Sequence, residues 1–212
     1  MITIKTFVFN PFQVNTYILY DETKKCIIID PACMDKFEEN ELSEFIEKHN
    51  LQPLKIYNTH THLDHVAGNR FVAEKYLINL EIHKNSHYLL HSAITDAQRF
   101  GLDLIESVEP SAFISDGDII KFGSSELEVL YTPGHADGSV CFYSKNDEFV
   151  ISGDVLFNES IGRSDLPTGN HKLLVDSIKS KLLVLPEKTV VYPGHGPVTT
   201  IGYEKENNPF LT

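Results

Sequence analysis

Apolar and polar residues alternate in the first part of the chain. Ile2, Ile4 and Val8 fall on one face of a period-two pattern, which is typical of a strand with one buried face. The runs VNTYILY (14–20) and KCIIID (25–30) predict a second and a third strand, joined by a turn over residues 21–24. We therefore expect the chain to open as a meander.

The spacing of apolar residues then changes to that of a helix. Asp35 followed three residues later by Glu38 resembles a helix-capping pair, and an apolar stripe runs from Leu42 to about His49. The next predicted elements are a strand at 54–58, a helix at 65–77, a strand at 80–83 and a helix at 85–100. The segment 101–117 is the least regular, and we expect it to form a flexible cover over a site.

From residue 118 the strand pattern returns. The predicted elements are strands at 119–123, 127–131, 139–144 and 148–152, a loop at 161–169, a helix marked by Leu174, Ile178, Leu182 and Leu185, and a last strand in VVYPGHG (190–196). Two runs of strands, each flanked by helices, favour two sheets packed face to face with helices outside. The predicted architecture therefore has four layers.

Length and composition are those of an ordinary globular chain. At 212 residues, 42% hydrophobic and 23% charged, the chain can bury a core without disulfides, and we expect one domain over residues 1–212. No apolar run approaches the roughly 18 residues that a membrane span needs, and the N-terminus lacks the basic start and apolar centre of a secretory signal. We therefore expect a soluble, cytoplasmic protein.

Charge and cysteine spacing argue against two kinds of site. A formal net charge of -12 argues against binding nucleic acid, because phosphate contacts need clustered Lys or Arg. Cys26, Cys33 and Cys141 are far apart and form no Cys-x-x-Cys pair, so neither a disulfide framework nor a thiolate zinc site is indicated. We expect these cysteines to be small core residues.

The stretch THTHLDHVAGN (59–69) concentrates imidazole groups beside a carboxylate. In an extended segment residues i and i+2 project to the same side, so His60 and His62 can reach one ion together. Asp64 and His65 are adjacent, which suits the entry to a helix better than its middle. The pattern is therefore not the His-Glu-x-x-His helix of a metalloprotease.

Three further candidate ligands follow predicted strands. His135, Asp154 and His195 each stand where a strand runs out, and we expect strand ends to converge on one edge of the sheet sandwich. Imidazole nitrogen and carboxylate oxygen bind zinc at about 2.0–2.2 Å, and a catalytic site leaves one position open. Five histidines and two aspartates are too many for one such ion and suit two ions with a carboxylate between them.

THTHLDH resembles the His-x-His-x-Asp-His signature of the metallo-β-lactamase superfamily, and the later three candidates match its remaining ligands in order. The likeness spans the whole chain and implies that family's αββα sandwich, an α/β (α+β) fold. The implied ligands are His60, His62 and His135 for a first metal, Asp64, His65 and His195 for a second, and Asp154 as the bridge. The resemblance implies two divalent ions, with Zn²⁺ expected first and iron or manganese as alternatives.

Within the superfamily the chain most resembles short glyoxalase II-like hydrolases, through PFQVNTYIL, IIIDPA, GRSDLP and GHGPVTTIGYEKENNPFL. Such enzymes hydrolyse thioesters such as S-lactoylglutathione. The resemblance therefore implies a small-molecule thioester substrate, attack by a hydroxide held between two metals, and Asp64 and Asp154 as catalytic residues. Full-length glyoxalase II enzymes carry a C-terminal helical domain that grips glutathione, whereas this chain ends soon after His195, so the thiol carrier is left open.

Three other functions remain as alternatives. Similar proteins with a single iron act as persulfide dioxygenases, and their ligands are largely a subset of those named above. Hydrolysis of a lactone or a phosphodiester is an alternative on the same centre. A binding or sensor module that retains metal without turnover is the third, and the complete ligand set argues against it. The sequence does not indicate an oligomeric state.

Three polar residues close to these motifs are expected to have structural roles. Arg163 and Asp165 are expected to pair and brace their loop, with an anionic substrate as the alternative partner of Arg163. His171 is expected to be an ordinary polar residue at the start of a helix.

Glycines stand beside two of the candidate ligands, and four other histidines lie outside the ligand pattern. Gly134, Gly194 and Gly196 are expected to permit the tight turns that aim His135 and His195. The histidines without a ligand pattern, expected to be surface or core residues, are His49, His83, His87 and His91.

Overall fold

The computed structural model describes residues 1–211 and contains two six-stranded sheets. The helices are α1 (Lys36–Lys48), α2 (Asn69–Tyr76), η1 (Lys84–Ser86), α3 (His87–Arg99), α4 (His171–Ser177), its continuation η2 (Ile178–Leu182) and α5 (Ile201–Asn207). The strands are β1 (Thr3–Phe9), β2 (Val14–Tyr20), β3 (Lys25–Ile29), β4 (Gln52–Tyr57), β5 (Asn79–His83), β6 (Ala112–Ile114), β7 (Ile119–Phe122), β8 (Ser125–Tyr131), β9 (Val140–Ser144), β10 (Phe149–Gly153), β11 (Leu156–Phe157), β12 (Ser160–Ile161), β13 (Val190–Pro193) and β14 (Thr199–Thr200).

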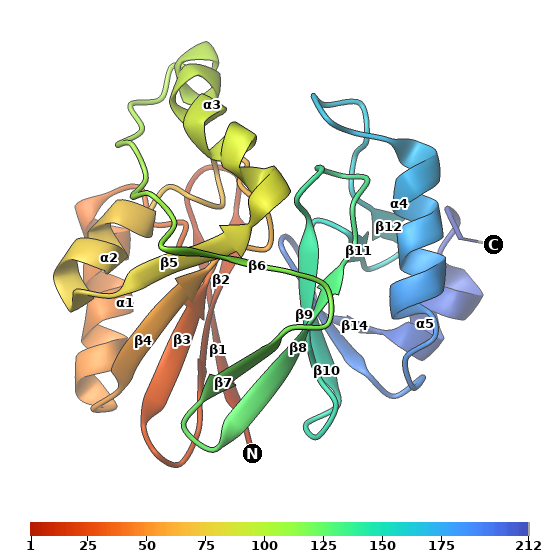
Figure 1. Ribbon diagram of the computed structural model, residues 1–212, viewed down its shortest axis with the longest axis horizontal. Helices are drawn as coiled ribbons and strands as arrows, with labels where there is room; N and C mark the ends of the chain where they lie inside the picture. Colours follow the sequence, from red (N-terminus) through yellow and green to blue (C-terminus); the bar gives the residue numbers. More distant parts are fainter. Residues whose placement is uncertain (212) are drawn as a thin grey trace.

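The two sheets are built from the two halves of the chain. The first has the order β1-β2-β3-β4-β5-β6, and the second has the order β14-β13-β10-β9-β8-β7. In Figure 1 the helices α1 and α2 cover the outer face of the first sheet, α3 stands above its upper end, and α4 and α5 cover the outer face of the second sheet. The predicted four-layer arrangement is confirmed.

Alternation along the central strands creates three separate cores. Cys26 and Ile28 of β3 pack with residues of α1, α2 and α3. The intervening Ile27 and Ile29 face the second sheet, where they meet residues such as Phe142 of β9. A third core lies between the second sheet and the helices α4 and α5. Successive side chains of a strand point to opposite faces, so each central strand serves two cores at once. The three cysteines are buried and free, as predicted.

The first helix begins as predicted but uses its capping residues differently. The side chain of Asp35 accepts hydrogen bonds from the backbone N–H groups of Phe37 and Glu38, both at 2.9 Å. Glu38 does not close a capping box on Asp35. Its carboxylate accepts from the backbone N–H of Met34 at 2.7 Å and of Asn10 at 2.6 Å. Glu38 therefore ties the start of α1 to the loop after β1.

Two predictions about the secondary structure are wrong, one on where a helix begins and one on which strand is the last. The helix predicted at 65–77 begins only at Asn69, because residues 62–68 form turns closed by bonds such as His65 N–H to His62 O at 3.1 Å. VVYPGHG is not the last strand, since β14 and α5 follow it. Thr200 caps α5 by accepting from the backbone N–H of Tyr203 at 3.2 Å.

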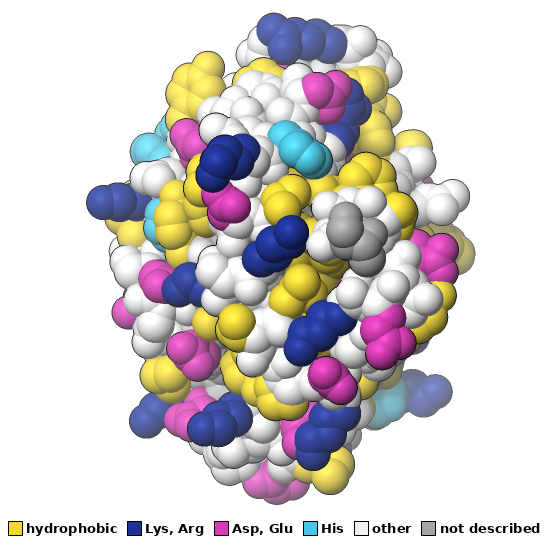
Figure 2. All heavy atoms as spheres, turned by 90° about the vertical axis from the view of Figure 1, so that its right-hand side faces the viewer, with side chains coloured by type: hydrophobic (Ala, Val, Ile, Leu, Met, Phe, Trp, Pro, Cys, Tyr) yellow, Lys and Arg dark blue, Asp and Glu magenta, His cyan; other side chains and the backbone are white. Residues whose placement is uncertain are grey.

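The outer surface carries mixed charge. Figure 2 shows the face formed by α4 and α5, on which Lys and Arg side chains are interspersed with Asp and Glu side chains and hydrophobic groups lie between them. Among residues 1–211, no helix is both long and apolar enough to cross a bilayer.

Asp21 lies in the turn after β2 and fastens the first sheet to the second. Its buried carboxylate accepts hydrogen bonds from Thr23 N at 2.9 Å, Ser124 N at 2.6 Å and Ser125 Oγ at 2.9 Å. Burial alone would raise the pKa of Asp21, but these donors hold it well below its usual range. The ionised carboxylate is therefore the form that the fold stabilises.

Replacement of Asp21 by asparagine should lower the free energy of unfolding by about 2 kcal/mol at pH 7, because hydrogen bonds to a charged group are lost. The folded-state pKa is depressed, so the contribution is full above the unfolded-state pKa of about 3.9 and is lost as the pH falls below it. Urea denaturation at pH 7 and pH 3 should show a stability difference that shrinks at the lower pH. The exposed Asp103→Asn variant is the control, and equal stability of D21N and wild type at pH 7 would contradict the assignment.

Candidate metal centre

The seven predicted ligands come together at one edge of the sandwich. His60, His62, Asp64 and His65 follow β4, His135 follows β8, Asp154 follows β10 and His195 follows β13. Strand β8 is antiparallel to β9, β9 is antiparallel to β10, and β10 is parallel to β13. Strands β8, β10 and β13 therefore run in the same direction, and their carboxyl ends meet at the same edge, as the sequence predicted.

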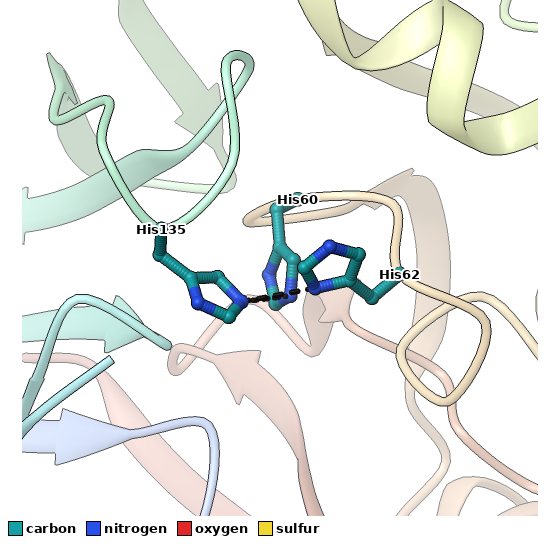
Figure 3. Close-up of side chains that lie close together, drawn as sticks. All are labelled: His60, His62 and His135. Atoms are coloured by element: carbon teal, nitrogen blue, oxygen red, sulfur yellow. Dashed lines mark hydrogen bonds between the residues drawn. The ribbon is translucent and has the colours of Figure 1, made fainter. Parts of the chain in front are cut away.

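His60, His62 and His135 form a first triad. His135 Nε2 lies 3.2 Å from His60 Nε2 and 2.9 Å from His62 Nδ1. Figure 3 shows the three rings arriving from two loops and pointing at one another. Three nitrogens on different rings thus face one point, which suits a single cation.

Asp64, His65 and His195 form a second triad beside the first. His195 Nε2 lies 3.4 Å from Asp64 Oδ2 and 3.4 Å from His65 Nε2. Asp154 stands between the triads, with its Oδ2 3.6 Å from His135 Nε2 and 3.5 Å from His195 Nε2. One carboxylate oxygen therefore faces both sets of ligands.

The outward nitrogens of the imidazole rings have hydrogen-bond partners that the sequence did not reveal. His135 donates through Nδ1 to the backbone oxygen of Arg163 at 2.7 Å, and His195 donates through Nδ1 to that of Phe12 at 2.9 Å. These bonds place the proton on Nδ1 and leave the lone pair of Nε2 facing the centre.

Asp30 supports a ring of each triad. Its Oδ2 accepts from His65 Nδ1 at 3.0 Å and from Thr59 Oγ1 at 2.6 Å. Since the Thr59 hydroxyl donates its proton to Asp30, its oxygen accepts from His60 Nδ1 at 3.1 Å. This buried carboxylate therefore fixes the tautomers of both His60 and His65.

The three imidazole rings of the first triad are neutral at neutral pH. Burial lowers the pKa of His60 well below its usual value, and the neighbouring imidazoles lower it further. Burial likewise lowers the pKa of His62 to about 4 and depresses that of His135. At neutral pH these rings offer lone pairs rather than protons.

The second triad has the opposite tendency because of its carboxylates. Burial alone would lower the pKa of His65, but Asp154, Asp64 and Asp30 raise it well above its usual value. Burial also opposes protonation of His195, yet hydrogen bonds to Asp154 and Asp64 raise its pKa to about 9. This part of the centre therefore attracts positive charge.

The donor set fits divalent cations. Oδ1 of Asp154 is a buried oxygen that accepts no hydrogen bond from any residue between 1 and 211. The inward nitrogens of His60 and His135 lie 3.2 Å apart although their outer nitrogens carry the protons, so their lone pairs face each other. A cation placed among these atoms satisfies lone pairs that no proton satisfies.

Glycines clear space around the centre, for two different reasons. Gly134 and Gly196 have φ values of 131° and 75°, which confirms the expected tight turns. At Gly194 the requirement is close approach, since a Cβ there would lie 2.1 Å from Asp154 Oδ1. A side chain at position 194 would therefore enter the metal centre itself.

The start of β2 anchors the turn that carries His195. Asn15 Nδ2 donates to the backbone oxygens of Pro193 at 2.9 Å and Gly196 at 3.0 Å. Thr16 Oγ1 donates to the backbone oxygen of Asp30 at 2.7 Å. Asn15 and Thr16 thus position one candidate ligand and one supporting carboxylate.

A cavity of about 610 Å³ opens onto the centre. Five of the seven candidate ligands border it, and its other walls come from α3, from β11 and from the loops after β1, β4 and β12. The wall residues are Phe12, Leu63, Leu89, Asp96, Arg99, Phe100, Phe157, Arg163, Leu166 and Pro167. The cavity is therefore mainly apolar, with two guanidinium groups on its walls.

Arg163, Asp165 and His171 have the arrangement that the sequence predicted. Arg163 binds Asp165 in a bidentate pair, with both N–O distances at 2.8 Å. This pair braces the loop before α4, while Arg163 also borders the cavity. His171 starts α4 with an exposed side chain.

The chain matches a known family model over most of its length. Residues 9–195 match the model described as "Metallo-beta-lactamase superfamily". One relative is "Hydroxyacylglutathione hydrolase GloC" of Haemophilus influenzae, which is 36% identical over 202 residues covering 94% of this chain and 93% of that protein.

Solved structures with the same fold cover both chains almost completely. The crystal structure of BLEG-1 B3 metallo-beta-lactamase superposes with a TM-score of 0.91 at 37% identity and covers 99% of this chain and 100% of its own. The crystal structure of TTHA1623 in a di-iron-bound form superposes with a TM-score of 0.88 at 36% identity and covers 98% and 100%. With the fold, the converging ligands and these similarities in agreement, the chain belongs to the metallo-beta-lactamase superfamily and is a metal-dependent hydrolase of that superfamily.

Proposed function

We propose that this protein hydrolyses small thioesters of the S-lactoylglutathione class at a dinuclear metal centre. The observation that carries the proposal is the pair of ligand triads that share Asp154 at the end of an apolar cavity. The similarity to GloC, a hydroxyacylglutathione hydrolase by name, supports the thioester class. The similarity to a protein that binds two irons supports the metal count.

Each residue of the centre has a defined task in this scheme. His60, His62 and His135 would hold one cation, Asp64, His65 and His195 the other, and Asp154 both. When bound, the two cations would make a water molecule nucleophilic near neutral pH and stabilise negative charge on the attacked carbonyl oxygen. Zn²⁺ is the proposed occupant, with iron and manganese as alternatives.

The reaction adds water across the carbon–sulfur bond. The water oxygen bonds to the carbonyl carbon, the carbon–sulfur bond breaks, and sulfur leaves as a thiolate that takes up a proton. Asp64 borders the cavity, and we assign it the orientation of the attacking water through its carboxylate. The apolar cavity walls would hold the acyl group and exclude bulk water from the reacting carbon.

The second triad favours two metals over one. A single-iron dioxygenase needs only part of the ligand set, whereas here Asp64, His65 and His195 form a complete group of their own. We therefore rank hydrolysis above oxidation of a persulfide. Hydrolysis of a lactone, a phosphodiester or a β-lactam would use the same centre, and the likeness to BLEG-1 makes the β-lactam an informative substrate to include.

Elemental analysis and substrate assays on one preparation test the proposal. We expect at least about two transition-metal ions per chain and a kcat/KM for S-lactoylglutathione that exceeds those for a lactone, a phosphodiester and a β-lactam by orders of magnitude. Oxygen uptake with glutathione persulfide, together with about one iron per chain, would replace the proposal with the dioxygenase function. Metal-loaded protein that turns over none of these substrates would reject both.

Arg163→Met should weaken the binding of an anionic thioester. Arg163 borders the cavity and its charge is exposed, so its loss should raise KM by only about fivefold, with kcat unchanged. A neutral thioester should show no such rise, and Arg70→Met on α2 serves as the matched control. An equal rise in KM for both thioesters would rule out charge recognition by Arg163.

A further inference from the structure

Outside the metal centre, two histidines and a glutamate converge on the surface at the start of α3. His87 and His91 stand one helical turn apart. His87 Nε2 lies 3.1 Å from Glu109 Oε2, His91 Nε2 lies 3.4 Å from Glu109 Oε1, and the two Nε2 atoms lie 3.2 Å apart. Three ligand atoms from two separate segments thus face one point.

Hydrogen bonds cannot satisfy this arrangement. Each neutral imidazole carries one ring proton, and an ionised carboxylate carries none. If both Nε2 atoms donate to Glu109, their two N–H groups face each other at 3.2 Å. If His91 donates to His87 instead, the proton of His91 is used and the proton of His87 lies on Nδ1, so neither Nε2 has a further proton to donate to the carboxylate. A cation at the centre satisfies all three lone pairs together.

The separations are those of ligands around one transition-metal ion. Ligands at about 2.0–2.2 Å from zinc lie roughly 3–3.5 Å from one another. The three distances fall in this range and match the 3.2 and 3.4 Å between ring nitrogens in the catalytic centre. The side chains are 41%, 47% and 67% exposed for His87, His91 and Glu109, so water can complete the coordination.

We propose that His87, His91 and Glu109 form a further binding site for a divalent transition-metal ion of the zinc class, separate from the dinuclear centre. Its two imidazoles and one carboxylate favour such ions over magnesium or calcium, which prefer all-oxygen sites. The site joins the start of α3 to the segment just before β6. It therefore closes the chain between residues 87 and 109 into a loop.

This loop contains a wall of the substrate cavity. Leu89, Asp96 and Arg99 of α3, together with Phe100, border the cavity. A cation held by residues 87, 91 and 109 fastens both ends of this wall and restricts its opening. Metal bound on the outer surface thus stabilises the shape of the cavity without touching the reacting atoms.

Metal counting tests the site. The wild type, His91→Ala and Glu109→Gln are dialysed to equilibrium against the same series of free Zn²⁺ concentrations, and zinc per chain is measured. At saturation the wild type should hold about one zinc more than either variant. His171→Ala, which removes another exposed histidine, should match the wild type. Because the result is a difference between variants, it does not depend on occupancy or activity of the dinuclear centre. Equal zinc content in the wild type and both variants would overturn the proposal.

Limited proteolysis tests the fastening. At a free Zn²⁺ concentration about ten times the dissociation constant of the additional site, cleavage within residues 101–108 should be about tenfold slower in the wild type than in His91→Ala. Both proteins contain the dinuclear ligands, so zinc in that centre protects them equally. Binding of the additional zinc with no change in cleavage would overturn the fastening role.

Discussion

Replacement of Asp154 by alanine is expected to lower thioester hydrolysis by about 10³-fold or more, since metal catalysis contributes several kcal/mol and each 1.4 kcal/mol is about tenfold in rate. Asp154 Oδ2 faces ring nitrogens of both triads, His135 at 3.6 Å and His195 at 3.5 Å. Its removal would leave each of the two metal positions with one ligand fewer. Activity and metal content should therefore fall together, and both are measured on protein dialysed against a fixed free metal concentration.

The fold should survive this substitution. Within residues 1–211, Oδ1 of the Asp154 carboxylate accepts no hydrogen bond, and Oδ2 lies beside His135 and His195. Circular dichroism and thermal unfolding of the metal-free proteins should be nearly the same for D154A and wild type. Asp176→Ala, on the exposed side of α4, is the control for a lost carboxylate. A folded D154A enzyme with full activity would exclude a bridging role.

Replacement of Asp30 by asparagine is expected to weaken metal binding by about 10- to 100-fold, the usual effect of losing an outer partner of metal-bound histidines. Asp30 accepts from His65 Nδ1 and from Thr59 Oγ1, and through Thr59 it orients His60. Asparagine has the same shape and tolerates the positive φ of 49° at this position. The loss can therefore be assigned to charge and hydrogen bonding.

Competition with a chromophoric chelator measures this affinity directly. Thr59→Val separates the two branches, because it breaks the link to His60 and leaves the bond from His65 Nδ1 to Asp30. It should therefore weaken metal binding less than D30N. If D30N bound metal as tightly as the wild type, Asp30 would have a role in the fold but none in metal binding.

The clustering of the seven candidate ligands could be predicted because their signals are local. His60, His62, Asp64 and His65 lie within one short motif, and the other three ligands each follow a recognisable strand. Their partners could not be predicted, since His195 donates to a backbone oxygen 183 positions away and His65 to a carboxylate 35 positions away. Every residue has a backbone carbonyl, so the sequence does not show which carbonyl accepts the hydrogen bond of a given histidine. Only the folded structure shows it.

The architecture followed from long periodic segments, and the errors lie in short ones. The seven-residue β2 was predicted because it is a continuous run that is buried on both faces, and the 13-residue α1 because its apolar residues recur at helical spacing. Helix α5 has seven residues and buries only Ile201 and Glu204, too few to set a helical period. Val8 shares a face with Ile2 but is 60% exposed on the edge strand β1. Alternation of apolar and polar residues shows which side chains share a face of a strand, but it does not show which part of that face other elements cover.

The dinuclear centre itself is tested most directly by a crystal of the metal-loaded protein measured at the absorption edge of the bound metal. The account predicts two anomalous peaks at this centre, about 3.5–4 Å apart and distinct from any peak at His87, His91 and Glu109, one among His60, His62 and His135, the other among Asp64, His65 and His195, with Asp154 in contact with both. A single peak, or peaks elsewhere with these seven side chains unliganded, would contradict it.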